Sequence, residues 1–240
     1  CADLVVQSGL GRVVVGMVDP DPRTAGKGIT RLRMAGLQVT EAALVADQLG
    51  LAGHAAHLQH GRPHVTLKLA LSLDGCIALA SGESQWITGE IARAHAMRER
   101  ARADAIVVGG GTLRADNPRL NVRLPGLESR SPQRWVLSRK PAPDGWQRLA
   151  SPDQIGAMDN VRYLFVEGGA DAAAAFLAED LVDRLLIYRA PILIGGGLPA
   201  IGDIGLNALS MAHGLWERSD SRQLGSDTLE VYRRTRNQGQ

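Results

Sequence analysis

The sequence predicts an α/β protein built around a mainly parallel sheet. Short runs of β-branched and other apolar residues, such as 105–108 (AIVV) and 161–166 (VRYLFV), are typical of buried strands. Helix-like segments separate such runs, and a strand–helix–strand order favours parallel neighbours. Two of the runs end in consecutive glycines, at 109–111 and 168–169. These three observations together define the predicted fold class.

Composition excludes several classes of protein. The chain has 240 residues, of which 45% are apolar and 22% charged, which is ordinary for a globular protein. Its formal net charge is only +2 and its arginines are scattered, whereas a nucleic-acid-binding protein carries a clustered basic stripe. No apolar run approaches the roughly 20 residues of a membrane span. Two cysteines make no disulfide framework, so we expect a cytoplasmic protein.

The first 60 residues are predicted to be the end of an α/β unit. Residues 12–18 and 37–40 are expected to be strands, with a helix at 29–34 between them. Two strands would make a poor independent domain. The chain opens with Cys1 and has no lead-in before its first strand-like run, so we expect a fragment or a product that lacks an upstream part.

Gly61-Arg62-Pro63 is a natural joint, which predicts one domain at 1–60 and a second at 61–236. In the second, Thr88 is expected to cap a helix that reaches about Ala103, with Glu90 in the first turn, where the helix dipole favours negative charge. The other predicted elements are strands at 65–70, 76–79, 105–108, 134–137, 161–166 and 228–232, a turn at 72–75, a helix at 171–177, and one long or two short strands at 185–194.

The two glycine runs predict a site for a phosphate-bearing ligand. At the carboxyl end of a buried strand that leads into a helix, backbone N–H groups are free and the helix dipole is positive. Glycine lets a phosphate approach that backbone closely. The alternative is a tight connection that only needs a positive φ. Neither run matches the G-x-G-x-x-G pattern with a suitably spaced acid, which disfavours an ordinary dinucleotide fold.

Two further stretches contain side chains suited to such a ligand. Trp86 stands among small polar residues before a helix, where its ring offers a flat surface for a nicotinamide or pyrimidine, unless it is only a half-buried loop residue. Residues 114–123 mix Asp116 with several arginines, which suit bidentate phosphate binding, although a solvated loop would look the same.

Four histidines, His54, His57, His60 and His64, are spaced as if along one helix face. This spacing is compatible with a metal site. A solvated linker helix is the alternative that we favour.

The ordered set of motifs resembles the reductase domain of the bifunctional riboflavin-biosynthesis deaminase–reductases. The resemblance rests on LKLALSLDGCIALASGESQWITG (67–89), ARADAIVVGGGTLRADNPRLNVR (101–123) and FVEGGADAAAAFL with LVDRLLIYRAPILIGGG (165–177 and 181–197). The N-terminal stretch that ends in RVVVGMVDPDPRTAGKGITRLRMAGLQV (12–39) is similar to the end of the family's zinc deaminase domain, which is cytidine-deaminase-like.

The resemblance implies a dihydrofolate-reductase-like, three-layer α/β reductase domain, in this chain behind a deaminase remnant. It implies an oxidoreductase of a multifunctional riboflavin-biosynthesis enzyme, which uses NADPH to reduce 5-amino-6-(5-phosphoribosylamino)uracil to the ribityl form. It also implies a homodimer. Carried onto matching positions, the cofactor residues are Trp86, Thr112, Asp116, Ser138, Gly169, Ala170 and Asp171, the phosphate-holding turn running on to Ala175. The substrate residues are Ser84, Arg100, Leu120, Arg123 and Glu167.

The reaction also needs a proton. Lys68 and Asp116 are our candidate catalytic residues, because a buried Lys or Asp beside a ligand can have its pKa tuned. For Lys68 the alternative is an ion pair at a strand edge.

The chain departs from the family in two places. Cys1 matches the last zinc cysteine, but the His-x-Glu motif and the first cysteine are absent, so we predict no deaminase activity and a zinc site only if the missing half is present. The segment 124–166 is short, Arg139 follows Ser138 where the family has Asp-Ser, and Asn117 replaces a frequent Asp. Arg139 is therefore a candidate partner for a 2′-phosphate.

Two rival functions stay open. One is a reductase of the non-deaminated diaminopyrimidine, which an attached deaminase remnant argues against. The other is a non-catalytic chain that binds a nucleotide or a partner.

Overall fold

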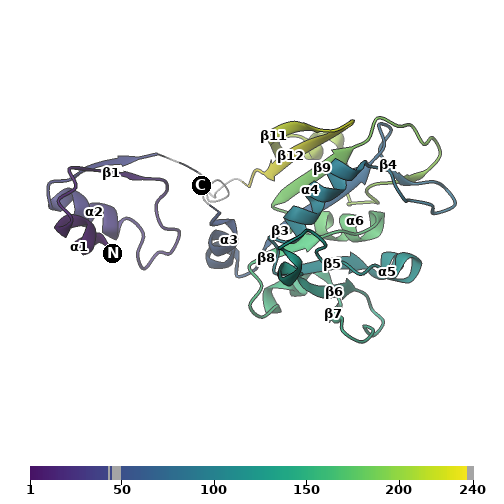
Figure 1. The fold of residues 1–240 in the computed structure, drawn as a ribbon, viewed down its shortest axis with the longest axis horizontal. Coiled ribbons are helices and arrows are strands. Elements are labelled where there is room, and N and C mark those ends of the chain that lie inside the picture. Colours follow the sequence, from purple (N-terminus) through teal and green to yellow (C-terminus); the bar gives the residue numbers. More distant parts are fainter. Residues whose placement is uncertain (43, 45–49, 237–240) are drawn as a thin grey trace. The chain divides into compact units, whose positions relative to one another are not determined.

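The computed structural model describes residues 1–42, 44 and 50–236 (Figure 1). The chain divides into two compact units, Cys1–Pro63 and His64–Gln240. Within the described part, no helix is both long and apolar enough to cross a membrane.

The first unit is small and leaves much apolar surface exposed. Its elements are α1 (Ala2–Gln7), β1 (Arg12–Val15), α2 (Lys27–Met34), β2 (Gln38–Glu41) and α3 (Ala52–His60). Strands β1 and β2 are parallel, as a strand–helix–strand unit requires. Helix α2 buries Ile29 and Leu32, but Val14 is 59% exposed and Met34 79%. Two strands and short helices thus enclose only a small core.

The second unit is organised around a mixed sheet in the order β11-β12-β9-β3-β8-β5-β6-β7. Its strands are β3 (His64–Leu71), β5 (Ala105–Gly109), β6 (Gln133–Leu137), β7 (Gln147–Leu149), β8 (Tyr163–Val166), β9 (Arg184–Arg189), β11 (Trp216–Leu224) and β12 (Asp227–Arg234). The strands from β9 to β7 are all parallel to one another. Strand β12 pairs antiparallel with β9, and β11 pairs antiparallel with β12. A separate antiparallel pair joins β4 (Cys76–Ala78) to β10 (Leu198–Pro199).

Both faces of this sheet are covered, which makes three layers (Figure 1). Helix α4 (Glu90–Arg100) packs Ala92 and Ala96 onto one face. Helix α6 (Ala170–Ala178) and the 3₁₀ turn η2 (Pro152–Ala157) cover the other. Side chains alternate along β3, so that Leu67 and Leu69 join the core under α6. The remaining elements are α5 (Gly110–Asp116), η1 (Glu128–Arg130) and η3 (Leu209–Ala212).

The start of α4 differs from the prediction. Thr88 does not cap it: Gly89 is the N-cap, no side chain of the helix caps it, and the helix ends at Arg100 and not near Ala103. The Gly89 N–H instead donates to the Asp227 carboxylate at 2.7 Å. A residue 138 positions away thus accepts the N–H of the N-cap residue, as the Glu or Gln of a local capping box would.

The segment 185–194 holds neither one long strand nor two short ones. Only Arg184–Arg189 is strand, and the chain then forms a loop. That loop is fixed by the Asp74 carboxylate, which accepts the N–H groups of Ile194 at 3.2 Å and Gly195 at 2.7 Å. Since these backbone donors are used by a side chain, no strand partner is needed for them.

Two strands of the sheet were not predicted. Residues 216–224 (WERSDSRQL) form the edge strand β11, whose side chains are mostly exposed and polar. An edge strand of this kind shows no apolar alternation. Strand β7 has only three residues, too few to give a periodic signal.

The four histidines do not share one helix face, contrary to prediction. His54, His57 and His60 lie in α3, but His64 opens β3 in the second unit. Within the described residues, no group of three or more His, Cys, Asp or Glu is arranged to hold a metal ion.

Candidate functional site

The sheet brings the two glycine runs together. Strands β5 and β8 are parallel neighbours, so their carboxyl ends meet at one edge of the sheet. Gly109 ends β5 and is followed by Gly110-Gly111, and Gly168-Gly169 comes one residue after β8. The Gly169 N–H donates to the Thr112 hydroxyl at 3.2 Å, which links the two tips directly. We call this edge, with its loops, the carboxyl edge.

Position 168 requires glycine because Ala172 of α6 lies too close for any side chain there. A Cβ built there would lie 2.5 Å from the Ala172 Cβ, far inside van der Waals contact. A Cβ on Gly109 would lie 3.3 Å from the same atom. The first turn of α6 therefore packs directly against both strand tips.

Helix α6 begins at this point without a side-chain cap. Its N-cap is Gly169, and Ala170 and Asp171 follow in the first turn. The first N–H groups of a helix have no intrahelical acceptor, and the helix dipole makes this end positive. The exposed Asp171 carboxylate, in the first turn, offsets part of that positive potential. The backbone here fits an oxyanion, as a pyrophosphate linkage would supply.

An ion pair stands beside the β8 tip. Arg100 donates from Nη2 to both carboxylate oxygens of Glu167 at 3.0 Å, and from Nε to Oε1 at 3.2 Å. Both side chains are 13% exposed. A third donor, Nη1, reaches the Asn121 carbonyl at 3.1 Å. Arg100 is therefore held by the Glu167 carboxylate and the Asn121 carbonyl.

Lys68 lies next to this pair by strand register. Strands β3 and β8 pair up to Leu67 opposite Val166, so Lys68 and Glu167 are the next residues on adjacent strands. Leu67 and Val166 belong to the core under α6, and alternation turns Lys68 and Glu167 to the α4 face. Among the residues that the structure describes, the Lys68 ammonium has no hydrogen-bond or ion-pair partner. A half-buried lysine is therefore the strand neighbour of a paired glutamate.

A cavity of about 340 Å³ opens beside the β5 and β6 tips. It is lined by Gly110, Arg114, Asn117, Ser138, Lys140 and Pro143, among others. The Ser138 hydroxyl accepts the Lys140 N–H at 3.0 Å, which fixes the turn. In the described part of the chain, neither the Arg114 guanidinium nor the Lys140 ammonium has a hydrogen-bond or ion-pair partner. The cavity thus combines two free cations with a hydroxyl.

The other predicted site residues are placed as follows. Trp86 is 66% exposed, Ser84 is half-buried, and Asp116 is the exposed last residue of α5. Leu120 is buried against the core under α4 with φ of +53°, and Arg123 is exposed. Asp116 therefore lies at the far end of α5 from the glycine tip, whereas Lys68 lies beside Glu167.

A buried polar pair under α4 was not predicted. The His95 ring Nδ1 and the Tyr188 hydroxyl are 2.8 Å apart. Burial lowers the pKa of His95 and raises the pKa of Tyr188, so both are neutral at neutral pH. The two residues are 93 positions apart, and no local pattern links them. Lys140 was not predicted as a site residue either, because only the fold brings it into one cavity with Arg114.

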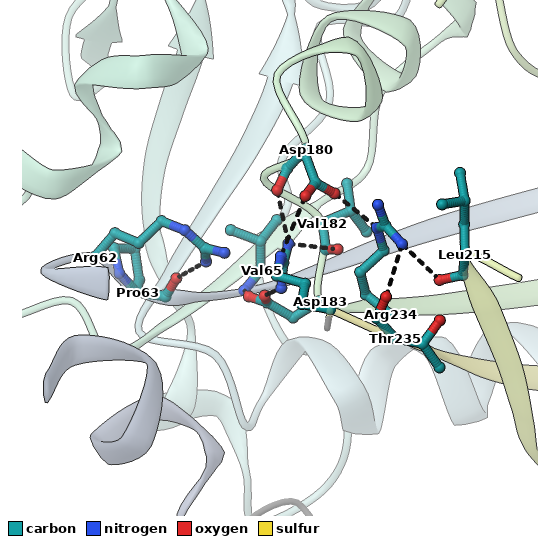
Figure 2. A network of polar contacts seen from close by, with 10 residues as sticks. Arg62, Pro63, Val65, Asp180, Val182, Asp183, Leu215, Arg234 and Thr235 are labelled. Carbon is teal, nitrogen blue, oxygen red and sulfur yellow. Dashed lines mark hydrogen bonds and ion pairs between the residues drawn. The ribbon is translucent and has the colours of Figure 1, made fainter. Parts of the chain in front are cut away.

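A second cavity, of about 680 Å³, lies at the opposite edge, where β3, β8 and β9 begin and β12 ends. It is lined by Asp180, His213, Leu215, Arg234 and Arg236, among others. Here the arginines already have protein acceptors: Arg234 donates to the Asp180 carboxylate at 2.7 Å and to the Leu215 and Thr235 carbonyls (Figure 2). Arg236 pairs with both Asp180 and Asp183. We call this the amino edge.

Comparison with known proteins gives a consistent set of relatives. A family model described as the RibD C-terminal domain matches residues 63–152 and 153–229. A riboflavin biosynthesis protein RibD of Mycobacterium tuberculosis is 37% identical over 247 residues, which cover 95% of this chain and 72% of that protein. A RibD of Corynebacterium ammoniagenes is 36% identical and covers 92% of this chain and 70% of that protein.

Solved structures agree. Acinetobacter baumannii RibD superimposes with a TM-score of 0.77 at 30% identity, over 98% of this chain and 76% of that one. A Thermotoga maritima deaminase/reductase gives a TM-score of 0.77 at 24% identity, over 98% and 74%, which is evidence for the fold alone. The α/β reductase fold and the family resemblance drawn from the sequence are thereby confirmed.

Proposed function

Because the chain belongs to the RibD C-terminal domain family, we propose that it is the reductase of riboflavin biosynthesis. It would use NADPH to reduce the ribosyl group of 5-amino-6-(5-phosphoribosylamino)uracil to a ribityl chain. The observation that carries the proposal is the arrangement of Lys68 and the Arg100–Glu167 pair beside two joined glycine tips.

The carboxyl edge fits a dinucleotide. The uncapped start of α6, at Gly169, Ala170 and Asp171, would take the pyrophosphate together with Thr112. The cavity lined by Ser138, Arg114 and Lys140 would take the adenosine end, where two free cations favour a 2′-phosphate. Arg139 is exposed beside it, and Trp86 would meet the nicotinamide. When bound, NADPH supplies the hydride.

The substrate residues divide into two groups. Glu167, held by Arg100, accepts hydrogen bonds from the pyrimidine or ribose, while Ser84 and Leu120 complete the pocket wall. Arg123 is exposed and would bind the substrate phosphate. Protein groups in such a site orient the two reactants and exclude water.

Proton delivery is assigned to Lys68 before Asp116. Lys68 lies beside Glu167 by register, and its ammonium has no partner within the described residues, so we assign it to a substrate oxygen. Asp116 is exposed at the far end of α5 and fits a contact to the cofactor better.

Residues 1–60 would be the remnant of a zinc deaminase domain, and 61–236 the reductase domain. The exposed Cys1 alone does not fit a catalytic zinc, which needs three protein ligands. We therefore assign deaminase activity and zinc only to a chain with a complete ligand set. A cytoplasmic homodimer is the expected state. The edge strand β11 is mostly polar and exposed, so it offers little apolar surface for such a dimer. The apolar contact would instead come from exposed side chains in residues 192–211, such as Leu193 and Leu209.

One assay separates the proposal from its rivals. The full chain is mixed with NADPH and either the deaminated or the non-deaminated pyrimidine, and loss of NADPH absorbance is followed. We expect faster oxidation with the deaminated substrate. Preference for the other substrate would support the diaminopyrimidine reductase. NADPH binding by calorimetry without oxidation of either would support a non-catalytic binding chain.

A further inference from the structure

Trp86 is supported on one side by an arginine. The Arg93 guanidinium carbon lies 4.7 Å from the centre of the Trp86 ring, which is cation–π distance. The same guanidinium donates from Nη1 to the Thr88 carbonyl at 2.5 Å. Arg93 belongs to the first turns of α4 and is only half-buried. One side chain thus fixes both the indole ring and the backbone two residues further on.

The same segment has a second anchor. Thr88 is buried, and the next residue, Gly89, donates its N–H to Asp227, which is 2% exposed. A Cβ at Gly89 would lie 3.4 Å from that carboxylate, so the contact is close. Residues 86–89 are therefore held from α4 by Arg93 and from the β11–β12 hairpin by Asp227.

The ring itself remains available. Trp86 is 66% exposed although Arg93 covers part of it. An exposed indole on a loop normally samples several rotamers, and ordering it on binding costs free energy. A ring that is already held lowers that cost. A guanidinium is suited to this task because it can stack on an aromatic face and donate in its own plane, which an ammonium cannot do.

We propose that Arg93 is a positioning residue for the nicotinamide cofactor, acting through Trp86. It holds the indole as a preformed platform for the cofactor ring. The inference rests on the proposed NADPH-dependent function and adds to it a residue that does not touch the reacting atoms.

The test is NADPH affinity, measured by calorimetry on the full chain. Arg93→Ala should raise the dissociation constant for NADPH about three- to tenfold, because the cation–π contact and the preorganisation are both lost. Arg93→Lys should show a smaller loss, because it keeps the charge without the planar fork. Arg98→Ala is the matched control: Arg98 is exposed on the same helix, and its variant should bind NADPH like wild type.

A double-mutant cycle with Trp86→Leu tests the route of the effect. If Arg93 acts through Trp86, then Arg93→Ala should change NADPH affinity little in the Trp86→Leu background. Equal effects in both backgrounds, or unchanged affinity of Arg93→Ala and Arg93→Lys beside a wild type that binds NADPH, would overturn this inference alone. A wild type that does not bind NADPH would overturn both this inference and the proposed function.

Discussion

The two edges of the sheet both carry basic side chains, but the edges differ in how many of these side chains already have partners among the described residues. At the carboxyl edge, Lys68, Arg114 and Lys140 have no ion-pair partner among the described residues, and the backbone is open at two glycine tips. At the amino edge, Arg234 and Arg236 are bound to Asp180, Asp183 and several carbonyls.

This difference indicates that basic residues at the amino edge stabilise the fold, whereas the three named at the carboxyl edge are available for binding. The amino-edge cavity is the larger, yet its arginine donors are already used by protein oxygens, so an anion gains little there. Among the described residues of the carboxyl edge, Lys68, Arg114 and Lys140 have no protein acceptor, and the first N–H groups of α6 have none within the helix, so they can serve a ligand. Cavity size is therefore a poorer guide to the site than the state of its donors.

The largest effect is expected for Lys68. Lys68→Ala should lower kcat by about a hundredfold or more, which is typical for loss of a proton-transfer group. The melting temperature should change little, because the ammonium has no described partner to lose. Asp116→Asn serves as the second arm, with a smaller expected loss. Unchanged turnover in both variants would remove the assignment of proton delivery to these residues.

Arg100 should matter through Glu167. Arg100→Ala leaves a largely buried carboxylate unpaired, so we expect kcat/KM for the pyrimidine to fall by about 10- to 100-fold, as for loss of a buried charge pair. NADPH affinity should stay near the wild-type value, since Arg100 touches neither glycine tip in the described contacts. A variant that lost NADPH binding and kept substrate affinity would contradict this division.

The amino edge should show the opposite pattern. Asp183 accepts the Val65 N–H at 2.8 Å and pairs with Arg236, and its side chain is 10% exposed. Asp183→Ala should therefore lower the free energy of unfolding by about 2 kcal/mol. We expect kcat and KM to stay near wild type at a temperature where the variant is folded. Denaturant unfolding measures the first quantity, and loss of activity without loss of stability would erase the contrast between the edges.

The smallest effect concerns cofactor choice. Lys140→Ala should raise KM for NADPH about three- to tenfold, as expected for one charge-assisted phosphate contact. KM for NADH, which lacks the 2′-phosphate, should change less. Lys27→Ala, in the first unit, is the control. An equal rise for both cofactors would mean that Lys140 does not meet the 2′-phosphate.

The sequence alone predicted those parts of the fold that rest on local patterns. The buried runs at 105–108 and 161–166 became β5 and β8, and their glycines meet as the parallel-sheet rule requires. Contacts between distant residues could not be predicted. Asp227 binds the N-cap residue of α4 from 138 positions away, and Asp74 holds the loop at Gly195 from 121 positions away. Neither contact leaves a periodic trace in the sequence.

The same limit applies to the site. The family resemblance implied Arg100 and Glu167 as separate substrate residues, but only the fold shows that they bind each other. It likewise marked Trp86 without the arginine that supports it. A sequence pattern predicts which residue types lie at a strand end, and the register and helix packing decide which of them remain free for a ligand.

The most direct test of the central claim is amide hydrogen exchange on the full chain with and without NADPH. The account predicts that NADPH slows exchange at 109–113 and 167–172, and leaves exchange at 180–184 and 234–236 unchanged. Protection confined to the amino edge, or no protection at either glycine tip when NADPH is bound, would contradict it.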